Sequence, residues 1–188
     1  MRVISGSAKG SILAGFPGKD IRPTSDRIRE AIFSILYSRL GGMAGKKVLD
    51  LFAGTGAMGI EALSRGAAEA WFVERSCQAV ALIRKNLGHC RLENAARILA
   101  EEATASLPLL RGNRFDLIFV DPPYGENFLP PVLTMIDDGG LLSEKGVVCA
   151  EGGKKDQVPE AFGSLIRFKM NTYGSTVIHF FCHLPEKD

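Results

Sequence analysis

Short apolar runs alternate with helical segments through most of this chain, and this alternation restricts the fold more than any other feature of the sequence. The runs have the length and composition of buried strands and cover residues 46–52, 69–74, 96–101, 115–121 and 146–151. Between them, helical segments are expected at about 57–65, 77–91, 103–111 and 127–138. Strands that alternate with helices form parallel sheets covered on both faces. The sequence therefore predicts an α/β fold with a doubly covered, mostly parallel sheet.

The C-terminal part departs from this alternation. Residues 165–171 and 176–183 are both strand candidates, and the tight-turn residues Tyr173-Gly174-Ser175 lie between them. Two strands joined by a tight turn form a hairpin. The last strand is therefore expected to be antiparallel to the rest of the sheet.

The N-terminal part precedes the alternation. Residues 2–16 contain three glycines and predict a short hairpin with a loose turn. An amphipathic helix should follow, capped by Thr24 or Ser25 and ending near Gly41-Gly42. At 188 residues, the chain is expected to be a single domain. We expect this domain to span 1–188, with a hairpin extension at 1–22 and a leading helix at 24–41.

Composition excludes several classes of protein. Apolar residues make up 46% of the chain, too many for an intrinsically disordered protein. The strongly apolar runs, such as Phe115 to Val120, are much shorter than the ~20 residues of a membrane span. The start of the chain lacks the apolar segment of a secretory signal, so a cytoplasmic protein without a membrane partner is expected.

Charged residues, cysteines and histidines indicate which ligands the chain could bind. The net charge is only +2, but residues 1–30 hold six basic and three acidic side chains, which suits a phosphate-facing edge as well as an ordinary solvated surface. The four cysteines lack the spacing of a metal site, and we expect reduced thiols. The three histidines share no ligand pattern, and no metal site is predicted.

A glycine-rich loop follows the first strand of the predicted sheet. Its glycines Gly54, Gly56 and Gly59 let the backbone turn sharply and approach a ligand at the start of the next helix. Glu74 ends the following strand, where a carboxylate accepts hydrogen bonds from ribose hydroxyls. This loop predicts a nucleotide-type cofactor, and from these residues alone an NAD-linked oxidoreductase stays open.

Two further features favour a different cofactor. Asp50 directs a negative charge toward the loop, which would oppose a pyrophosphate but would suit the ammonium of a methionine-like cofactor. The fourth strand ends in Asp121-Pro122-Pro123-Tyr124, at the sheet edge where ligands gather. The prolines have no N–H to occupy nearby carbonyls, and Tyr124 offers a flat face for a planar base.

These motifs resemble the class I S-adenosylmethionine-dependent methyltransferases that modify exocyclic amines, whose fourth strand ends in a [DNS]PP[YF] turn. With Arg22-Pro23-Thr24 to Glu30, the loop DLFAGTGAMGIEALSRGA, VDPPY and the late Tyr173-Gly174 hairpin, the chain is similar to the RsmD family over about residues 2–182. That family methylates a guanine N2 in 16S ribosomal RNA. The resemblance implies a Rossmann-like, mostly parallel seven-stranded sheet with an antiparallel last strand, preceded by an N-terminal hairpin and helix.

The resemblance also implies roles for individual residues. Asp121, Pro122, Pro123 and Tyr124 match the catalytic turn. Contacts with S-adenosyl-L-methionine are expected from Asp50, Phe52, Ala53, Gly54, Thr55, Gly56, Glu74, Arg75, Glu102 and Ala103. RNA contacts are expected from Arg2, Lys9, Arg22 and Arg27. The implied partner is 16S RNA within a 30S subunit or assembly intermediate, bound by a monomeric enzyme.

The sequence departs from the family pattern at two places. Family members more often have Asp-Ala where this chain has Glu102-Ala103, and a richer basic and aromatic run where it has Ser7 to Ser11. Arg22, Arg27 and Arg29 have an alternative role as structural partners of Asp26 and Glu30. Alternative functions are an adenine-N6 or other amine methyltransferase on DNA or RNA, an NAD-linked oxidoreductase, and a non-catalytic RNA-binding domain.

Overall fold

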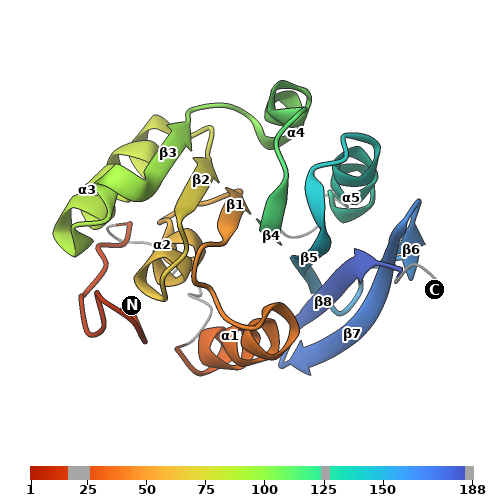
Figure 1. Cartoon of the computed structure of the whole chain (residues 1–188), viewed down its shortest axis with the longest axis horizontal. Coiled ribbons are helices and arrows are strands. Elements are labelled where there is room, and N and C mark those ends of the chain that lie inside the picture. Colours follow the sequence, from red (N-terminus) through yellow and green to blue (C-terminus); the bar gives the residue numbers. More distant parts are fainter. Residues whose placement is uncertain (17–25, 124–127, 185–188) are drawn as a thin grey trace.

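An eight-stranded sheet forms the centre of the computed structural model, which describes residues 1–16, 26–123 and 128–184 (Figure 1). Within these ranges the strand order is β3-β2-β1-β4-β5-β8-β7-β6. The strands are β1 (Lys47–Leu51), β2 (Glu69–Val73), β3 (Ala96–Leu99), β4 (Phe115–Val120), β5 (Leu142–Gly153), β6 (Ala161–Phe162), β7 (Leu165–Tyr173) and β8 (Thr176–His183). The helices are α1 (Asp26–Leu40), α2 (Ala57–Ser64), α3 (Cys77–Cys90), α4 (Ala103–Ser106) and α5 (Leu129–Asp138), with short 3-10 helices at Glu93–Ala95 and Leu107–Leu110.

The strand directions confirm the predicted topology. Strands β1 to β5 pair in parallel, and β8 runs antiparallel to both β5 and β7. The sheet has one strand more than the seven expected, because the two-residue β6 pairs with the start of β7. A strand of two residues is too short to give an alternating pattern, so the sequence did not reveal it.

Alternate residues of each central strand enter two separate apolar layers. On β4, Leu117 and Phe119 pack with α1, α2 and α3, whereas Ile118 and Val120 pack with α4 and α5 on the opposite face. Both faces are therefore covered, which explains why these strands are apolar throughout. Within the described ranges, no helix combines the length and apolar character needed to cross a bilayer.

The predicted helix at 103–111 is interrupted. Helix α4 ends at Ser106, and a 3-10 helix follows at Leu107–Leu110. Pro108 has no N–H for a bond to the carbonyl four residues earlier, so the α-helix cannot continue through it. The predicted caps of α1, Thr24 and Ser25, lie outside the described residues. All four cysteines are free thiols, as predicted.

The N-terminal arm, residues 1–16, folds back on itself as a minimal hairpin. Arg2 and Ile12 form a single antiparallel bridge, and the amide of Val3 donates to the carbonyl of Ser11 at 2.9 Å. Three apolar side chains of the arm are buried in the α1–α3 layer: Val3, Ala8 and Leu13. The arm is thus a packed part of the structure.

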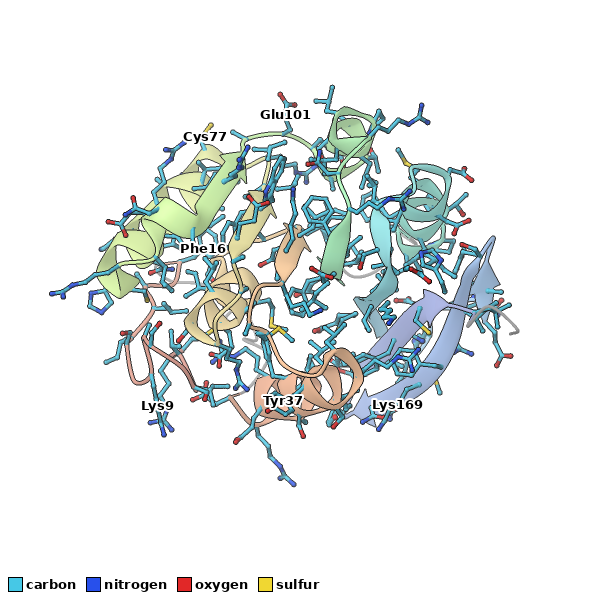
Figure 2. The ribbon with its side chains drawn as sticks, viewed as in Figure 1. Lys9, Phe16, Tyr37, Cys77, Glu101 and Lys169 are labelled. Atoms are coloured by element: carbon cyan, nitrogen blue, oxygen red, sulfur yellow. The ribbon has the colours of Figure 1, made fainter. Side chains whose placement is uncertain are left out.

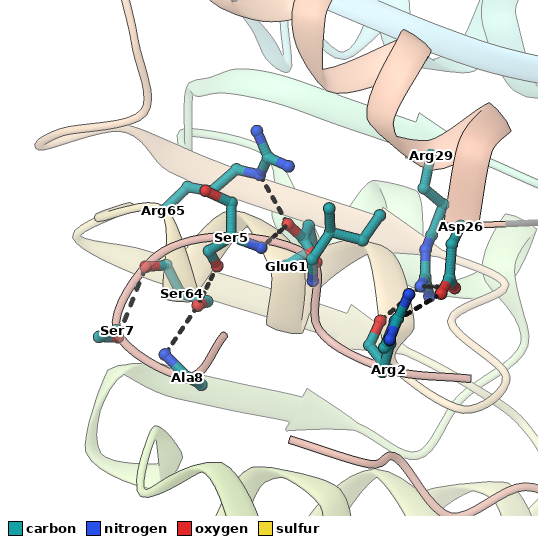
Figure 3. Close-up of polar contacts among 10 residues, drawn as sticks. Arg2, Ser5, Ser7, Ala8, Asp26, Arg29, Glu61, Ser64 and Arg65 are labelled. Atoms are coloured by element: carbon teal, nitrogen blue, oxygen red, sulfur yellow. Dashed lines mark hydrogen bonds and ion pairs between the residues drawn. The ribbon is translucent and has the colours of Figure 1, made fainter. Parts of the chain in front are cut away.

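Helix α2 holds the arm through polar contacts with arm backbone atoms (Figure 3). The carboxylate of Glu61 accepts hydrogen bonds from the amides of Ile4 at 2.8 Å and Ser5 at 3.0 Å. The hydroxyl of Ser64 donates to the carbonyl of Ser5 at 2.6 Å and accepts from the amide of Ala8 at 2.9 Å. These contacts fix the position of the arm along α2.

A buried asparagine on α3 provides the other attachment. The Asn86 side chain accepts from the amide of Ala14 at 2.8 Å and donates to the carbonyl of the same residue at 3.1 Å. It also donates to the carbonyl of Thr55, in the glycine-rich loop, at 3.0 Å. One side chain therefore connects the end of the arm to the loop after β1.

Gly6 allows the closest approach between the arm and α2. Gly6 has φ +86°, and a Cβ there would lie 1.7 Å from the carbonyl oxygen of Ser64. Gly10 has nearly the same φ, +87°, but no atom within 4 Å of an added Cβ. These two glycines separate the cost of backbone conformation from the cost of collision.

We expect Gly6→Ala to detach the arm from α2 and Gly10→Ala to leave it docked. Gly10→Ala should lower the free energy of unfolding by about 1 kcal/mol through backbone strain. Gly6→Ala should cost at least about 2 kcal/mol more, because the contacts with Glu61 and Ser64 are lost as well. Urea unfolding and limited proteolysis of the arm measure both effects. Equal losses in the two variants would contradict the docking described here.

Candidate active site

The predicted site residues gather at the edge of the sheet where the parallel strands end. Strand β1 lies between β2 and β4, so the strand order reverses there, and ligands of open α/β sheets bind at such reversals beyond the carboxyl ends of the strands. The loops that follow β1, β2 and β4 all begin at this edge. They carry the glycine-rich loop, Glu74 and Asp121.

The loop after β1 consists largely of left-handed turns. Phe52, Gly54 and Gly56 have φ values of 62°, 55° and 78°. Phe52 pays a conformational cost that glycine would avoid, and such strain concentrates at functional sites. Its ring packs against Phe128, the residue before α5, with ring centroids 5.9 Å apart. The loop therefore presents backbone and an aromatic face at the edge of the sheet.

Asp50 contacts the start of α2. Gly56 precedes this helix and has no side chain to cap it, but the carboxylate of Asp50 accepts a hydrogen bond from the amide of Gly59 at 2.9 Å. Gly59 is required for this approach, since a Cβ there would lie 2.4 Å from the ring of Phe72. One oxygen of Asp50 thus supports the helix, which the sequence analysis did not anticipate.

Burial changes the titration of Asp50. The residue is 3% exposed, and its burial raises the pKa of the carboxyl to about 7. The amide of Gly59 lowers this pKa, while the nearby charge of Glu74 raises it. Asp50 is therefore only partly ionised near neutral pH, and a cation bound beside it would favour the ionised form.

Glu74 closes the other side of the loop. Its carboxylate accepts from the amide of Gly54 at 2.9 Å and from the amide of Ser76 at 2.8 Å. Each carboxylate oxygen has a second lone pair, so these bonds leave room for ribose hydroxyls. The predicted ribose contact of Glu74 stays a prediction with suitable geometry.

Glu102 begins α4. Its carboxylate accepts from the amide of Ala105 at 3.1 Å and from the hydroxyl of Thr104. The bond from Thr104 is the main cause that lowers the pKa of Glu102, and the nearby charge of Arg75 also lowers it. Ala103 is buried and Arg75 is exposed. The carboxylate of Glu102 is thus engaged as a helix cap, and a contact with adenine stays untested.

A small pocket lies beside the turn after β4. The side chains of Phe119 on β4 and of Asp121 just after it face the pocket, as do Cys149 and Glu151 on β5. Ile32 of α1, Met58 of α2 and Ile178 of β8 complete the described lining, with Val120 at its edge. The pocket is therefore on the α1 side of the sheet, next to the glycine-rich loop.

The carboxyl group of Asp121 is in an unfavourable place for a negative charge. Much of the residue is accessible to solvent, but protein atoms surround the carboxyl, and this burial raises its pKa well above the usual value. The charges of Glu151 and Asp50 raise the pKa further. Pro122 is buried and Pro123 exposed, while Tyr124 lies outside the described residues. Strongly shifted carboxyls in a pocket mark a candidate functional site.

Sequence reasoning missed Glu151. It is the last residue of the strand candidate 146–151, and it follows Ala150 as Asp121 follows Val120, the residue paired with Ala150. The rule that drew attention to Asp121, a carboxylate at the carboxyl end of a parallel strand, applies equally to Glu151. The signal was therefore present in the sequence.

The predicted RNA-binding residues are partly brought together. Arg2 forms an ion pair with Asp26 at 3.0 Å, next to the exposed Arg27, and Lys9 extends from the arm into solvent (Figure 2). Arg22 lies outside the described residues. Arg29 is buried and bonds Asp26 at 2.8 Å, which confirms the structural role considered for it. In the described ranges, no cluster of three His, Cys, Asp or Glu side chains could hold a metal.

The sequence of this chain is similar to those of known proteins. The family model described as Conserved hypothetical protein 95 matches residues 1–182. The chain belongs to this family. YlbH of Bacillus subtilis (strain 168), provisionally named an rRNA methyltransferase, is 40% identical over 94% of this chain and 95% of its own length.

Two further relatives come from Escherichia coli. The protein named "Ribosomal RNA small subunit methyltransferase D" from strain K12 is 32% identical over 85% of this chain and 78% of its own length. The solved structure of yhhF superposes with a TM-score of 0.86, at 28% identity and over 97% of both chains. These matches confirm the RsmD-type resemblance and the fold predicted from the motifs.

We expect Asp50→Asn to change how stability depends on pH. The folded protein binds a proton at Asp50 up to about pH 7, whereas an unfolded Asp releases it near pH 4. The folded state thus holds more protons between these values, and wild-type stability should fall as pH rises through this range. Asn can accept the hydrogen bond from the Gly59 amide but does not titrate. The free energy of unfolding of the variant, relative to that of the wild type, should therefore rise by about 4 kcal/mol between about pH 4 and about pH 7.

Urea unfolding between about pH 4 and about pH 8 measures this difference. Asp138→Asn, at an exposed position at the end of α5, serves as the control. If the Asp50→Asn and wild-type stabilities stay parallel across this range, the raised pKa of Asp50 is wrong.

Proposed function

We propose that this protein is an S-adenosylmethionine-dependent methyltransferase that methylates the exocyclic N2 amine of a guanine in 16S ribosomal RNA. Family membership and the names of the relatives from Bacillus subtilis and Escherichia coli support rRNA methylation. The observation that carries the proposal is the pocket beside the turn after β4. Leu51 and Val120 are paired, so the glycine-rich loop and Asp121 begin side by side at the ends of adjacent strands.

The residues at the sheet edge suit a cationic cofactor. Asp50 and Asp121 are carboxyls with raised pKa values, and a positive charge between them would favour their ionised forms. When bound, S-adenosylmethionine supplies a methyl group on a positively charged sulfonium, whose leaving group departs as a neutral thioether. The pyrophosphate of NAD would instead bring negative charge beside these carboxyls, which disfavours an oxidoreductase.

Each part of the edge would hold a different part of this cofactor. The segment Asp50 to Gly56, which includes Phe52, Ala53 and Thr55, would surround the methionine portion. Glu74 and Arg75 would lie at the ribose. The backbone at Glu102-Ala103 would border the adenine, because the Glu102 carboxylate caps α4.

The turn Asp121 to Tyr124 would position the amine. The lone pair of guanine N2 is delocalised into the ring, so N2 is a weak nucleophile. N–H bonds from N2 to the Asp121 carboxylate and the Pro122 carbonyl would localise that lone pair and align it with the methyl group. Asp121 or water would accept the proton that N2 loses on methylation. Tyr124 would stack on the extruded base.

The RNA would meet the arm and the start of α1. Lys9 and Arg27 are exposed there, and Arg2 is 68% exposed in its ion pair with Asp26. We place the substrate in a 30S subunit or assembly intermediate, bound in the cytoplasm by a monomer whose single domain spans 1–188. Arg22, on the segment between arm and helix, completes the proposed RNA contacts.

Methyl-labelled S-adenosylmethionine, incubated with 30S particles or with naked 16S RNA, tests the proposed function. Nucleoside analysis of the product should find N2-methylguanosine. If the label is found in N6-methyladenosine, the protein is an adenine-N6 methyltransferase and the proposal is wrong. If the protein binds the cofactor but transfers no label, a non-catalytic RNA-binding domain is favoured.

We expect Asp121→Ala to reduce turnover far more than cofactor affinity. The carboxylate acts on the amine mainly as methyl transfer begins, so its loss should slow single-turnover methylation by about 10²-fold or more. Asp121→Asn keeps an acceptor for the N–H and should lose less. Calorimetric titration with S-adenosylmethionine serves as the control for folding and binding. A near-normal rate for cofactor-saturated Asp121→Ala would end the catalytic assignment.

We expect neutral residues at Lys9 and Arg27 to weaken RNA binding and to flatten its salt dependence. Each lost phosphate contact should reduce the slope of log K against log salt by about 0.7–0.9. Affinity for S-adenosylmethionine should not change. The control is Lys145→Gln, exposed near the start of β5, away from the carboxyl edge of the sheet. Identical slopes for the double variant and the control would exclude the arm from RNA binding.

A further inference from the structure

Glu151 lies beside Asp121 in the pocket. Strands β4 and β5 are parallel neighbours, and Val120 and Ala150 are the last pair in their register. The next residues, Asp121 just after β4 and Glu151 within β5, therefore lie at the same level, with backbones about 5 Å apart. Both side chains line the pocket, so both point to the α1 side of the sheet.

The pocket is acidic and has an apolar surround. Besides Asp121 and Glu151, its described lining consists of Cys149 and apolar residues, and no basic side chain is among them. Burial and the neighbouring charges of Glu151 and Asp121 raise the pKa of Cys149 well above its usual value, so the thiol is neutral. The pocket holds only about 20 Å³, so a ligand would present one edge to it rather than enter it. Two adjacent carboxyls favour an edge that carries neighbouring N–H donors.

Guanine has such an edge. Its ring N1–H and its exocyclic N2 amine are neighbouring donors, whereas adenine has an acceptor at N1 beside its N6 amine. With the N2 hydrogens bonded to Asp121 and the Pro122 carbonyl, the adjacent N1–H would need an acceptor of its own. Glu151 is the other carboxyl of this pocket and follows the residue paired with Val120, so it is the acceptor that the fold offers beside Asp121.

We propose that Glu151 selects guanine by accepting a hydrogen bond from the ring N1–H while Asp121 holds the N2 amine. This inference rests on the proposed function and adds a specificity residue to it. A base whose N1 is an acceptor would place a lone pair against a carboxylate and leave the carboxylate without a donor. Sites that bind a donor in this way discriminate strongly against an analogue that lacks it.

The base 2-aminopurine tests this contact directly. It keeps the N2 amine of guanine, but its N1 is an acceptor. After the guanine methylated by the wild-type protein has been mapped, the same position is made with guanine or 2-aminopurine in otherwise identical 16S RNA assembled into 30S particles. Single-turnover methylation by the wild type should be at least about tenfold faster for guanine. Equal rates would overturn the proposal without any variant.

Glu151→Gln should reverse much of this preference. The Gln amide can donate to the N1 of 2-aminopurine, so the guanine to 2-aminopurine rate ratio should fall by about tenfold or more relative to wild type. The comparison of ratios cancels the difference in intrinsic reactivity between the two amines. Glu144→Gln is the matched control: it lies on β5 too, but is exposed near the opposite end of the strand, and it should keep the wild-type ratio.

The outcomes separate this inference from the proposed function. If the wild type methylates guanine N2 but Glu151→Gln keeps the wild-type ratio, the specificity role is wrong and the proposed function stands. If Glu151→Gln slows both bases equally and weakens S-adenosylmethionine binding, Glu151 serves the cofactor instead, which also overturns the inference. If the wild type leaves guanine unmethylated in these particles, the proposed function fails first.

Discussion

The hydrogen bond between the buried carboxyl of Asp50 and the amide of Gly59 connects β1 to the start of α2, and much of the remaining structure depends on where that helix lies. Helix α2 begins in the glycine-rich loop and presents Glu61 and Ser64 to the N-terminal arm. A shift of α2 would therefore disturb both the loop and the arm. Gly59 makes the arrangement possible, because only a residue without Cβ fits against Phe72.

Acidic groups accumulate at the carboxyl edge of the sheet at a cost to folding. Burial of the carboxyls of Asp50 and Asp121 disfavours their ionised forms, and the negative neighbours add to that penalty. A fold without a ligand at this edge would gain stability from apolar residues at these positions. A bound sulfonium cation and the N–H donors of a base would offset the penalty, so the same electrostatics that weaken the fold would favour the proposed ligands.

Much of the fold could be predicted from the sequence, because its strands and helices carry strong periodic patterns. The antiparallel β8 followed from the Tyr173-Gly174-Ser175 turn, and the edge that carries Asp121 followed from the parallel sheet. Local patterns could not reveal contacts between distant segments. The capping of α2 by Asp50, the bonds from Asn86 to Ala14 and Thr55, and the pairing that places Glu151 beside Asp121 all depend on tertiary packing.

The arm is attached to α2 and α3 largely through its own main-chain atoms. Glu61, Ser64 and Asn86 bind amides and carbonyls of the arm, while Lys9 and Ile12 extend outward without a part in those bonds. Attachment and surface chemistry are therefore encoded at different positions. Substitution of an exposed side chain such as Lys9 or Ile12 would therefore change the surface of the arm without removing a bond that holds it. Ser7 and Ala8 differ from them, because their amides bond Ser64 directly.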